Sequence, residues 1–325
     1  MGSGTPGLRI RIALVGLLLL GAPCRPWAAE GVPPAVVGAP ALVPLVTRLV
    51  EGALGPRPGA TSRLRADELA LTLIDLRTPG IPASASYRGD VQIYPASVVK
   101  LFYLGAAHRW MEDGRLQRSE ELDRALRLMI VDSWNEASHY VLDLLTDTTS
   151  GPELAPEALE EWYRKRNAVN RYYESLGYRR VVANRKPWCE GPFGRERQSA
   201  LQHAPYRNLL TTGETGRLLQ EIVTRRMVTP ARCDQMLSLL ARDPVPKPND
   251  PESQVKGFVG EGLPRGAKLW SKAGWTSDTR HDAACVELPD GRRFILVVFT
   301  TNHSEDEGLI PSIARQAVAG IPPLP

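Results

Sequence analysis

Metal-binding motifs built on histidine and cysteine are missing from this sequence. Its 325 residues include five His and four Cys. They contain no CxxC pair, no HExxH motif and no His/Cys cluster, and the five His are dispersed. Because protein zinc sites draw on such clusters, a structural or catalytic metal is not expected.

A large excess of one charge sign is also missing. The chain has 40 Lys and Arg against 36 Asp and Glu. Three of the basic residues, Arg9, Arg11 and Arg25, lie in the first 29 residues, which hold no acidic residue. The rest of the chain therefore carries 37 basic and 36 acidic residues, a net charge of +1. Its arginine pairs are scattered and have acidic neighbours, so a nucleic-acid partner is not expected.

Hydrophobic runs long enough to cross a bilayer do not occur either. The longest, Ile12 to Ala22, is well short of the roughly 20 residues that a spanning helix needs. It follows Arg9 and Arg11 and is followed by the small residues Ala28 and Ala29, an arrangement typical of a signal peptide. We expect residues 1–29 to be removed on export to the periplasm or the medium, with no permanent membrane anchor. Lipidation at Cys24 stays open, although Pro23 before it fits that pattern poorly.

Export leaves three cysteines in an oxidising compartment, where thiols can pair. An odd number means that at least one of Cys189, Cys233 and Cys285 is unpaired within the chain. Cys285 lies in an apolar, strand-like run, which favours a buried free thiol. A bridge between Cys189 and Cys233 is possible, but sequence does not supply the geometry that it needs.

What is present is a globular composition, 43% hydrophobic and 23% charged. Strand patterns occur near both ends of the mature chain, at 68–75, 282–288 and 293–300. The near-continuous apolar run of the last suits a sheet covered on both faces. The middle follows a helical period of 3.6 residues. Ser119, Thr211 and Thr229 mark helix starts, and one long helix is expected from Pro156 to Gly177. The expected architecture of residues 30–325 is α/β with two lobes: a sheet lobe from about 41–96 and 264–325, and a helical lobe from about 97–263. A cleft between two lobes is a natural small-molecule site.

The first motif lies in Tyr94–Leu104, where apolar residues on nearly all sides predict a buried helix that begins at Pro95. Ser97 and Lys100 are three residues apart and so share one face of this helix. A buried lysine is costly unless it is paired or neutral, and desolvation lowers its pKa toward that of a base. Ser97 is therefore a candidate nucleophile and Lys100 its proton acceptor. A capping serine and a surface lysine would give the same spacing.

The second motif is Val131–Glu136, at a break between two helical segments. Ser133 supplies a hydroxyl that can pass a proton. The Asn135 amide can hold both a carbonyl group and a lysine. Alone, this motif would be read as a helix cap.

The third motif is Leu269–Trp275, which reads as a strand at the edge of the sheet. Lys272 offers a cation for a substrate carboxylate, and Gly274 would let a ligand backbone approach closely. The backbone N–H of Trp275 could join that of Ser97 in an oxyanion hole.

Together these stretches resemble the motif set of the serine β-lactamases and penicillin-binding transpeptidases, above all the class A β-lactamases. The motifs are Ser97-Val-Val-Lys100, Ser133-Trp-Asn135 and Lys272-Ala-Gly274. The resemblance runs from about residue 43 to residue 321. It implies a five-stranded antiparallel sheet with flanking terminal helices beside an all-helical lobe. It also implies acylation of Ser97 by a β-lactam or a D-Ala-D-Ala-like carbonyl group.

The sequence departs from the class A pattern at three positions in or beside the motifs. Trp275 stands where the family usually has a hydroxyl residue. Ala273 stands where the family has Thr, and Trp134 stands where class A enzymes have Asp, a position that varies among penicillin-binding proteins. Class A enzymes carry a deacylating glutamate on a long loop. Here a long loop is expected at 181–203, and Glu190 lies near the required position, with Glu196 as a weaker substitute.

The resemblance implies a monomeric serine β-lactamase that needs no cofactor. Ser97, Lys100, Ser133 and Glu190 would be catalytic, and Asn135, Lys272, Gly274 and Trp275 would bind substrate. One alternative is a D-Ala-D-Ala carboxypeptidase or transpeptidase, a penicillin-binding protein acting on peptidoglycan. Another is a non-hydrolytic domain that only binds β-lactams.

Overall fold

The computed structural model describes residues 1–2, 36–57, 62–78, 82–188, 191–245, 250 and 253–323. Residues 34–325 form one structural unit and the first 33 residues form another. Most of the expected signal peptide lies outside the described residues, as do Cys24, Cys189 and Glu190. Predictions that concern those residues therefore stay predictions.

An antiparallel sheet of seven strands forms the centre of the larger unit, in the order β1-β3-β2-β7-β6-β5-β4. Five of these strands correspond to the sheet that the sequence predicts, and β1 and β4, of two residues each, extend it at either edge. The strands are β1 (Val37–Gly38), β2 (Leu69–Asp75), β3 (Ala83–Tyr87), β4 (Ala241–Arg242), β5 (Lys268–Trp275), β6 (Thr279–Glu287) and β7 (Arg293–Thr301).

The apolar run of β7 is buried on both faces of the sheet, as its sequence predicts. Alternate side chains enter two separate cores, because successive residues of a strand point to opposite faces. Ile295, Val297 and Phe299 face one core. Phe294, Leu296 and Val298 face the other. Strands from the two ends of the chain meet here, where β2 pairs with β7.

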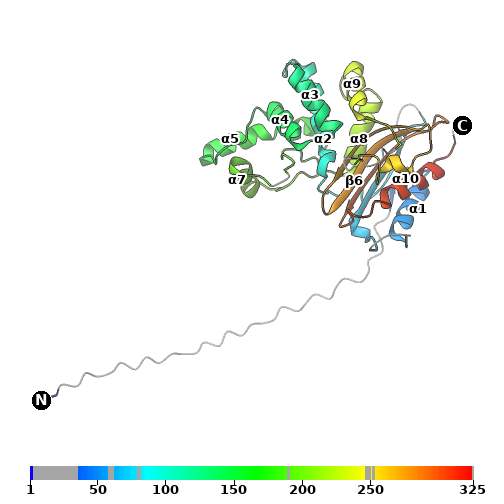
Figure 1. Ribbon diagram of the computed structural model, residues 1–325, viewed down its shortest axis with the longest axis horizontal. Coiled ribbons are helices and arrows are strands. Elements are labelled where there is room, and N and C mark those ends of the chain that lie inside the picture. The colour runs from blue at the N-terminus through cyan, green and yellow to red at the C-terminus, as the bar shows by residue number, and fades with distance from the viewer. Residues whose placement is uncertain are drawn as a thin grey trace. The chain divides into compact units, whose positions relative to one another are not determined.

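Helices cover both faces of the sheet (Figure 1). α1 and α10 pack together on one face, and α8 packs on the other, where α2 also contributes to the core. The helices are α1 (Val43–Leu54), α2 (Lys100–Glu112), α3 (Glu120–Ile130), α4 (Asn135–Thr146), α5 (Pro156–Arg166), α6 (Ala168–Ser175), α7 (Gly194–Gln202), α8 (Thr212–Val223), α9 (Pro230–Leu240) and α10 (Leu309–Gly320). Short 3-10 turns occur at η1 (Ala66–Glu68), η2 (Ala96–Val99) and η3 (Val259–Gly262).

Side-chain caps start three helices where the sequence predicts them. Ser119 accepts a hydrogen bond from Leu122 N at 3.1 Å and Thr211 one from Glu214 N at 3.1 Å. Thr229 accepts one from Arg232 N at 3.4 Å, with proline in the first turn of α9. These caps set the boundaries of α3, α8 and α9.

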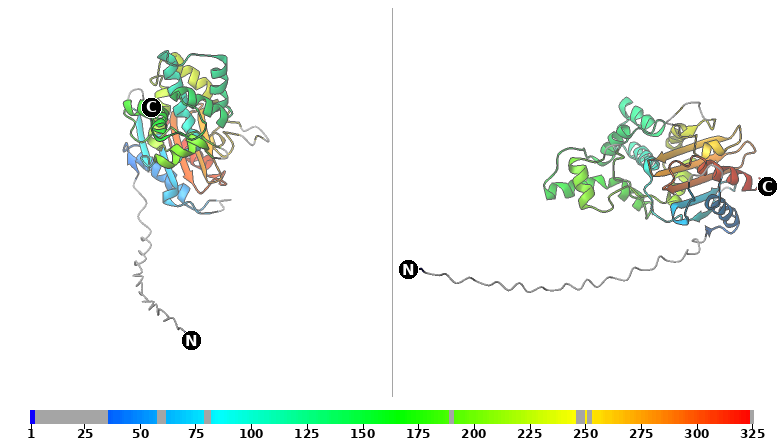
Figure 2. Two further views of the ribbon diagram at one scale, coloured as in Figure 1. Left: turned by 90° about the vertical axis from the view of Figure 1, so that its left-hand side faces the viewer. Right: turned by 60° about the horizontal axis from the view of Figure 1, so that its bottom comes forward.

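The helices α3 to α7 form a group beside the sheet (Figure 2). In this group the structure corrects two expectations. The single long helix expected after Pro156 is divided into α5 and α6 near Asn167. The loop expected at 181–203 contains the helix α7, because Glu196, Ser199 and Ala200 form a buried face that can pack against the group.

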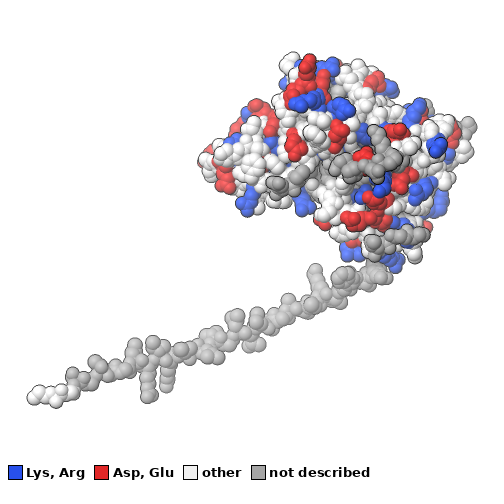
Figure 3. All heavy atoms as spheres, viewed as in Figure 1, with Lys and Arg blue, Asp and Glu red and all other residues white. Residues whose placement is uncertain are grey.

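Charged side chains of both signs are interspersed on the face shown in Figure 3. In the described part of the chain, no helix is long and apolar enough to cross a membrane. Cys233 and Cys285 are free and buried. Cys285 is therefore the buried thiol that the sequence predicts. The possible bridge between Cys189 and Cys233 depends on Cys189, which lies outside the described residues.

Candidate active site

Ser97 lies on the 3-10 turn η2, which leads directly into α2. The sequence predicts a helix from Pro95, whereas the α-helix begins at Lys100. The reason lies in the preceding backbone: Ala96 has φ of +46°, which a residue with a β-carbon rarely adopts. Such a conformation costs on the order of 1–3 kcal/mol and persists only when the surroundings hold it. The turn that carries Ser97 is therefore strained and held in place from outside.

Gly274 on β5 forms one side of that support. A β-carbon added to Gly274 would lie 2.7 Å from Ser97 N and 2.9 Å from both Pro95 O and Val98 N. Only glycine leaves room for this contact. We expected Gly274 to make space for a ligand, but the backbone that approaches it belongs to the η2 turn of the same chain.

Lys100 is fully buried and connects α2 to the second motif. Its Nζ donates to the Ser133 carbonyl oxygen at 2.5 Å and to Asn135 Oδ1 at 2.9 Å. Ser133 Oγ lies 3.3 Å from the same nitrogen. Hydrogen bonds to two neighbouring residues fix the position of the amine one turn after Ser97.

Ser133 stands between two lysines. Its hydroxyl accepts a hydrogen bond from Lys272 Nζ at 2.9 Å and also lies within reach of the Lys100 amine. The backbone of Ser133 has φ of +59°, so this residue too is held in the left-handed region. A hydroxyl that contacts two amines can receive a proton from one side and pass it on.

Lys272 is also fully buried, and its hydrogen-bonding capacity is used within the chain. Besides Ser133 Oγ, its Nζ contacts Gln254 Oε1 at 2.5 Å and Ala273 O at 2.7 Å. Burial, followed by the positive charge of Lys100, holds the pKa of Lys272 well below its ordinary value. Because an ammonium group has three N–H donors, Lys272 can reach a substrate carboxylate only by giving up one of these contacts.

Gln254 belongs to this cluster, although sequence reasoning missed it. Its Nε2 donates to Val131 O at 2.7 Å and to Ile130 O at 3.3 Å, while its Oε1 holds Lys272. Gln254 thus ties the third motif to the segment before Ser133. It lies in a polar stretch without periodicity, so no local pattern marks it.

The two tryptophans of the motifs differ in their surroundings. Trp134, between Ser133 and Asn135, leaves 55% of its surface exposed. Trp275 packs its ring on Phe258, with 5.6 Å between the ring centres. Trp275 ends β5 directly after Gly274, so its backbone lies beside the Ser97 turn, as an oxyanion hole requires.

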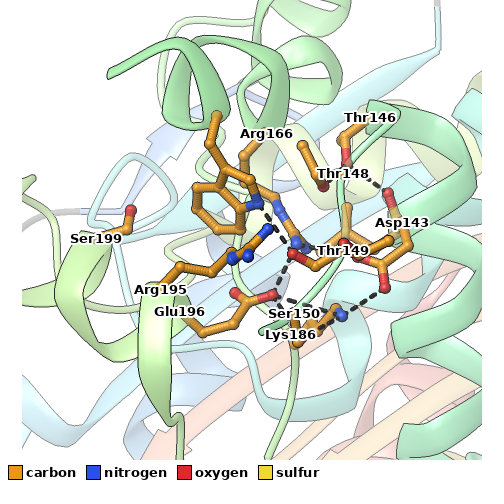
Figure 4. Close-up of polar contacts among 12 residues, drawn as sticks. Asp143, Thr146, Thr148, Thr149, Ser150, Arg166, Lys186, Arg195, Glu196 and Ser199 are labelled. Atoms are coloured by element: carbon orange, nitrogen blue, oxygen red, sulfur yellow. Dashed lines mark hydrogen bonds and ion pairs between the residues drawn. The ribbon is translucent and has the colours of Figure 1, made fainter. Parts of the chain in front are cut away.

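Glu196 does not take part in this cluster. It is buried in an ionic group of four side chains with Arg166, Lys186 and Asp143 (Figure 4). Glu196 Oε1 lies 2.7 Å from Arg166 Nη2, 3.4 Å from Lys186 Nζ and 3.0 Å from Ser150 Oγ. Glu196, the weaker substitute for Glu190 as deacylating base, therefore has its carboxylate committed to these buried cations.

A cavity of about 410 Å³ lies between the segment after α6 and the end of β5. Its lining includes Tyr94, Trp188, Tyr206, Arg207 and Thr276. Tyr94 precedes the Ser97 turn in the chain and Thr276 follows Trp275, although neither Ser97 nor Trp275 lines this cavity. Its volume is in the range of small-molecule sites.

Comparisons with known proteins bear on the fold and the family of this chain. A search of curated protein sequences finds no match. Among solved structures, a β-lactamase from Sphaerobacter thermophilus has a TM-score of 0.59 at 21% identity, with 86% of this chain and 98% of that chain covered. The structure of PBP-A has a TM-score of 0.58 at 18% identity, with 86% and 96% covered. An ancestral class A β-lactamase has a TM-score of 0.58 at 16% identity, with 86% and 100% covered.

These similarities establish the β-lactamase/transpeptidase-like fold that the motifs predict. The model of the "Beta-lactamase enzyme family" matches residues 63–321, which include all three motifs and both lobes. The chain therefore belongs to the β-lactamase enzyme family and is a serine hydrolase of the β-lactamase type.

Proposed function

We propose that this protein is a class A-type serine β-lactamase, which opens the β-lactam amide through an acyl-enzyme on Ser97. The observation that carries the proposal is the buried amine of Lys100, held by Ser133 and Asn135 one turn after Ser97. A buried amine one turn after a serine is a spacing that can activate such a nucleophile.

In the proposed acylation, Ser97 Oγ attacks the lactam carbonyl carbon and loses its proton to Lys100, or to Glu190 through a water molecule. The Ser133 carbonyl and Asn135 Oδ1 hold the Lys100 amine, which would have to be neutral to accept this proton. Ser133 then delivers a proton to the leaving nitrogen, since its hydroxyl contacts both lysines. The backbone N–H groups of Ser97 and Trp275 would stabilise the oxyanion.

Deacylation requires a base that activates water, and we propose Glu190 for this step. Asn135 and Lys272 would orient the substrate, Lys272 chiefly through Ser133, which it already contacts. No cofactor enters these steps. We further propose that the protein works after export, because residues 1–29 carry the pattern of a signal peptide.

A D-Ala-D-Ala carboxypeptidase or transpeptidase is the second candidate. Two observations favour it: Trp134 replaces the aspartate of the class A motif, and Glu196 is bound in a buried ionic group. Among the similar structures is an acyl-enzyme complex of a PBP-A mutant with penicillin G, at a TM-score of 0.59, 18% identity, and 84% and 96% coverage. A binding domain that does not release its acyl group would share the same first step.

One experiment separates these candidates. The purified mature protein is incubated with a chromogenic cephalosporin while colour and intact mass are followed. Continuous turnover supports the β-lactamase, and a persistent adduct supports a penicillin-binding protein or a binding domain. Ser97→Ala should abolish the adduct. Glu190→Gln should leave acylation and slow release by about 10²- to 10⁴-fold, as expected for loss of a general base.

The control is Glu153→Gln, which changes an exposed glutamate in the helical group. It should match the wild-type protein in both steps. Release at the wild-type rate from Glu190→Gln would remove Glu190 from the mechanism, and absence of any adduct on the wild-type protein would reject the proposed function.

A further inference from the structure

A buried histidine lies directly beside the Ser97 turn. His281 is on β6, where it is the cross-strand partner of Gly274 on β5. Cross-strand partners point to the same face of a sheet, so both residues face η2. The ring of His281 is fully buried and packs on Phe299, with 4.7 Å between ring centres.

Both ring nitrogens of His281 contact backbone groups. Thr300 N donates to Nδ1 at 3.0 Å, and Nε2 lies 2.8 Å from Tyr94 O. A backbone N–H can only donate and a carbonyl oxygen can only accept. Nδ1 must therefore carry a lone pair and Nε2 the hydrogen. The two contacts define a single neutral tautomer, and burial accordingly lowers the pKa of His281 to about 4.

The contact with Tyr94 O matters because the strained turn begins directly after Tyr94 in the chain. Pro95 O accepts a hydrogen bond from Val98 N at 3.0 Å, and Ala96 between them is in the left-handed region. Gly274 supports the later part of this turn, at Ser97 N. The first part is held at Ile93, which pairs with Leu210, and at Tyr94 O. His281 is thus the side chain that anchors the turn at its start.

We propose that His281 is a positioning residue for Ser97: its Nε2–H holds the Tyr94 carbonyl and so keeps the strained turn in the geometry for attack. This inference rests on the proposed acylation of Ser97. The distance between the Ser97 hydroxyl and the carbonyl of a bound substrate depends on the η2 turn. Without the bond from His281, this strained turn would relax. Misplacement of a reacting group by about 1 Å can cost about 10²-fold in rate.

Two substitutions separate the two hydrogen bonds of His281. Glutamine can place an N–H donor near the position of Nε2 and keep the bond to Tyr94 O. Asparagine is shorter and can only reach the position of Nδ1, where its oxygen can accept from Thr300 N. Each variant keeps one bond and loses the other, so a purely structural role predicts similar effects for both.

The test measures the rate of adduct formation with penicillin G by intact mass, per folded molecule, together with the unfolding midpoint. We expect His281→Asn to acylate about 10²-fold more slowly and His281→Gln to stay within about fivefold of the wild-type rate. If His281→Asn does not fold, His281→Met, which has the length of glutamine but no donor, takes its place. His108→Asn, a change at another buried histidine, should lower stability without slowing acylation per folded molecule.

Equal acylation rates for the glutamine variant and the asparagine or methionine variant would overturn the inference and leave the proposed function intact. A wild-type protein that forms no adduct would overturn both. The two failures are therefore distinguishable in one set of measurements.

Discussion

Two residues with unfavourable backbone angles lie at the centre of the site. Ala96 and Ser133 both have positive φ, at +46° and +59°, although neither is glycine. Each is fixed by buried neighbours: Ala96 by the contacts of the η2 turn, and Ser133 by the amines of Lys100 and Lys272. Strain held in this way keeps reacting groups in place before the substrate arrives.

A substitution at Gly274 tests whether the strained Ser97 turn depends on close support from β5. In Gly274→Ala, the new methyl group would lie 2.7 Å from Ser97 N, and the neighbour is backbone that cannot move aside cheaply. We expect acylation by penicillin G to slow by about 10²-fold while the protein stays folded. Stopped-flow or mass measurements of adduct formation give the rate.

Gly308→Ala is the matched control, because the nearest atom to its new methyl group lies at 3.7 Å, an ordinary contact. It should acylate at the wild-type rate. An unchanged rate for Gly274→Ala would show that the turn tolerates displacement and does not depend on close support from β5.

At the scale of elements, the segment between α6 and α8 is fastened to the rest of the protein by polar contacts. Asn208 accepts from Arg185 N at 2.9 Å and donates to Arg185 O at 2.8 Å, which closes the segment at its base. His139 on α4 contacts Pro187 O at 2.7 Å, and Trp188 packs on the same ring. These contacts place the residues just before Glu190 against the helix that begins with Asn135.

The ionic group in Figure 4 attaches the segment between α6 and α8 to the helical group a second time, through Glu196 on α7. Arg166 is fully buried and lies 3.0 Å from Asp143 Oδ1, while Lys186 lies 2.6 Å from Asp143 Oδ2. Two positive and two negative side chains therefore balance inside the helical group. Removing one of them leaves a buried charge without compensation.

Glu196→Gln should therefore lower the free energy of unfolding by about 3–5 kcal/mol, the usual effect of breaking a buried ion pair. Glu161→Gln is the matched control, since Glu161 pairs with Arg164 on the surface, where both side chains are more than half exposed. That change should alter stability by less than about 1 kcal/mol. Urea unfolding of both variants gives the comparison, and equal small effects would mean that the group in Figure 4 is not held by charge.

At the scale of the whole molecule, the sheet separates two apolar cores, and α2 contributes to one of them. His108 on α2 is buried, and its two ring nitrogens have no hydrogen-bond partner among the residues that the structure describes. Burial, together with the charges of Arg232 and Arg118, lowers the pKa of His108 to about 4.

This lowered pKa predicts acid sensitivity. A histidine that is neutral when folded stabilises the protein fully above its ordinary pKa of 6.5, and this contribution is lost as the pH falls toward 4. The loss is at most about 1.4 kcal/mol per pH unit for one histidine. His108→Leu removes the group, so its stability should fall less steeply between pH 6.5 and 4.

Urea unfolding at pH 8, 6 and 5 measures how the free energy of unfolding changes with pH in the wild-type protein and in His108→Leu. The variant should be close to the wild-type protein at pH 8 and more stable than it at pH 5. Parallel curves would contradict the assignment of His108 as a neutral buried group.

Much of the fold follows from local patterns in the sequence. The apolar run of β7 predicts a strand covered on both faces, and Ser119, Thr211 and Thr229 mark the starts of helices. The apolar run and the capping residues each depend on only a few neighbouring residues. Residues close together in the sequence are therefore sufficient to determine these elements. The helix α7 escaped prediction, because its buried face depends on Arg166 and Ser150, which are distant in sequence.

The sequence by itself determined the chemistry of the three motifs and their order, since a serine three residues before a lysine lies one turn from it in a 3-10 turn as in an α-helix. Only the tertiary structure decided how the motifs meet. It joined Lys100 and Lys272 through Ser133, added Gln254 and His281, and bound Glu196 among buried cations. The physical reason is that these contacts join residues far apart in the chain, and their energies arise only when folding removes the charged groups from water.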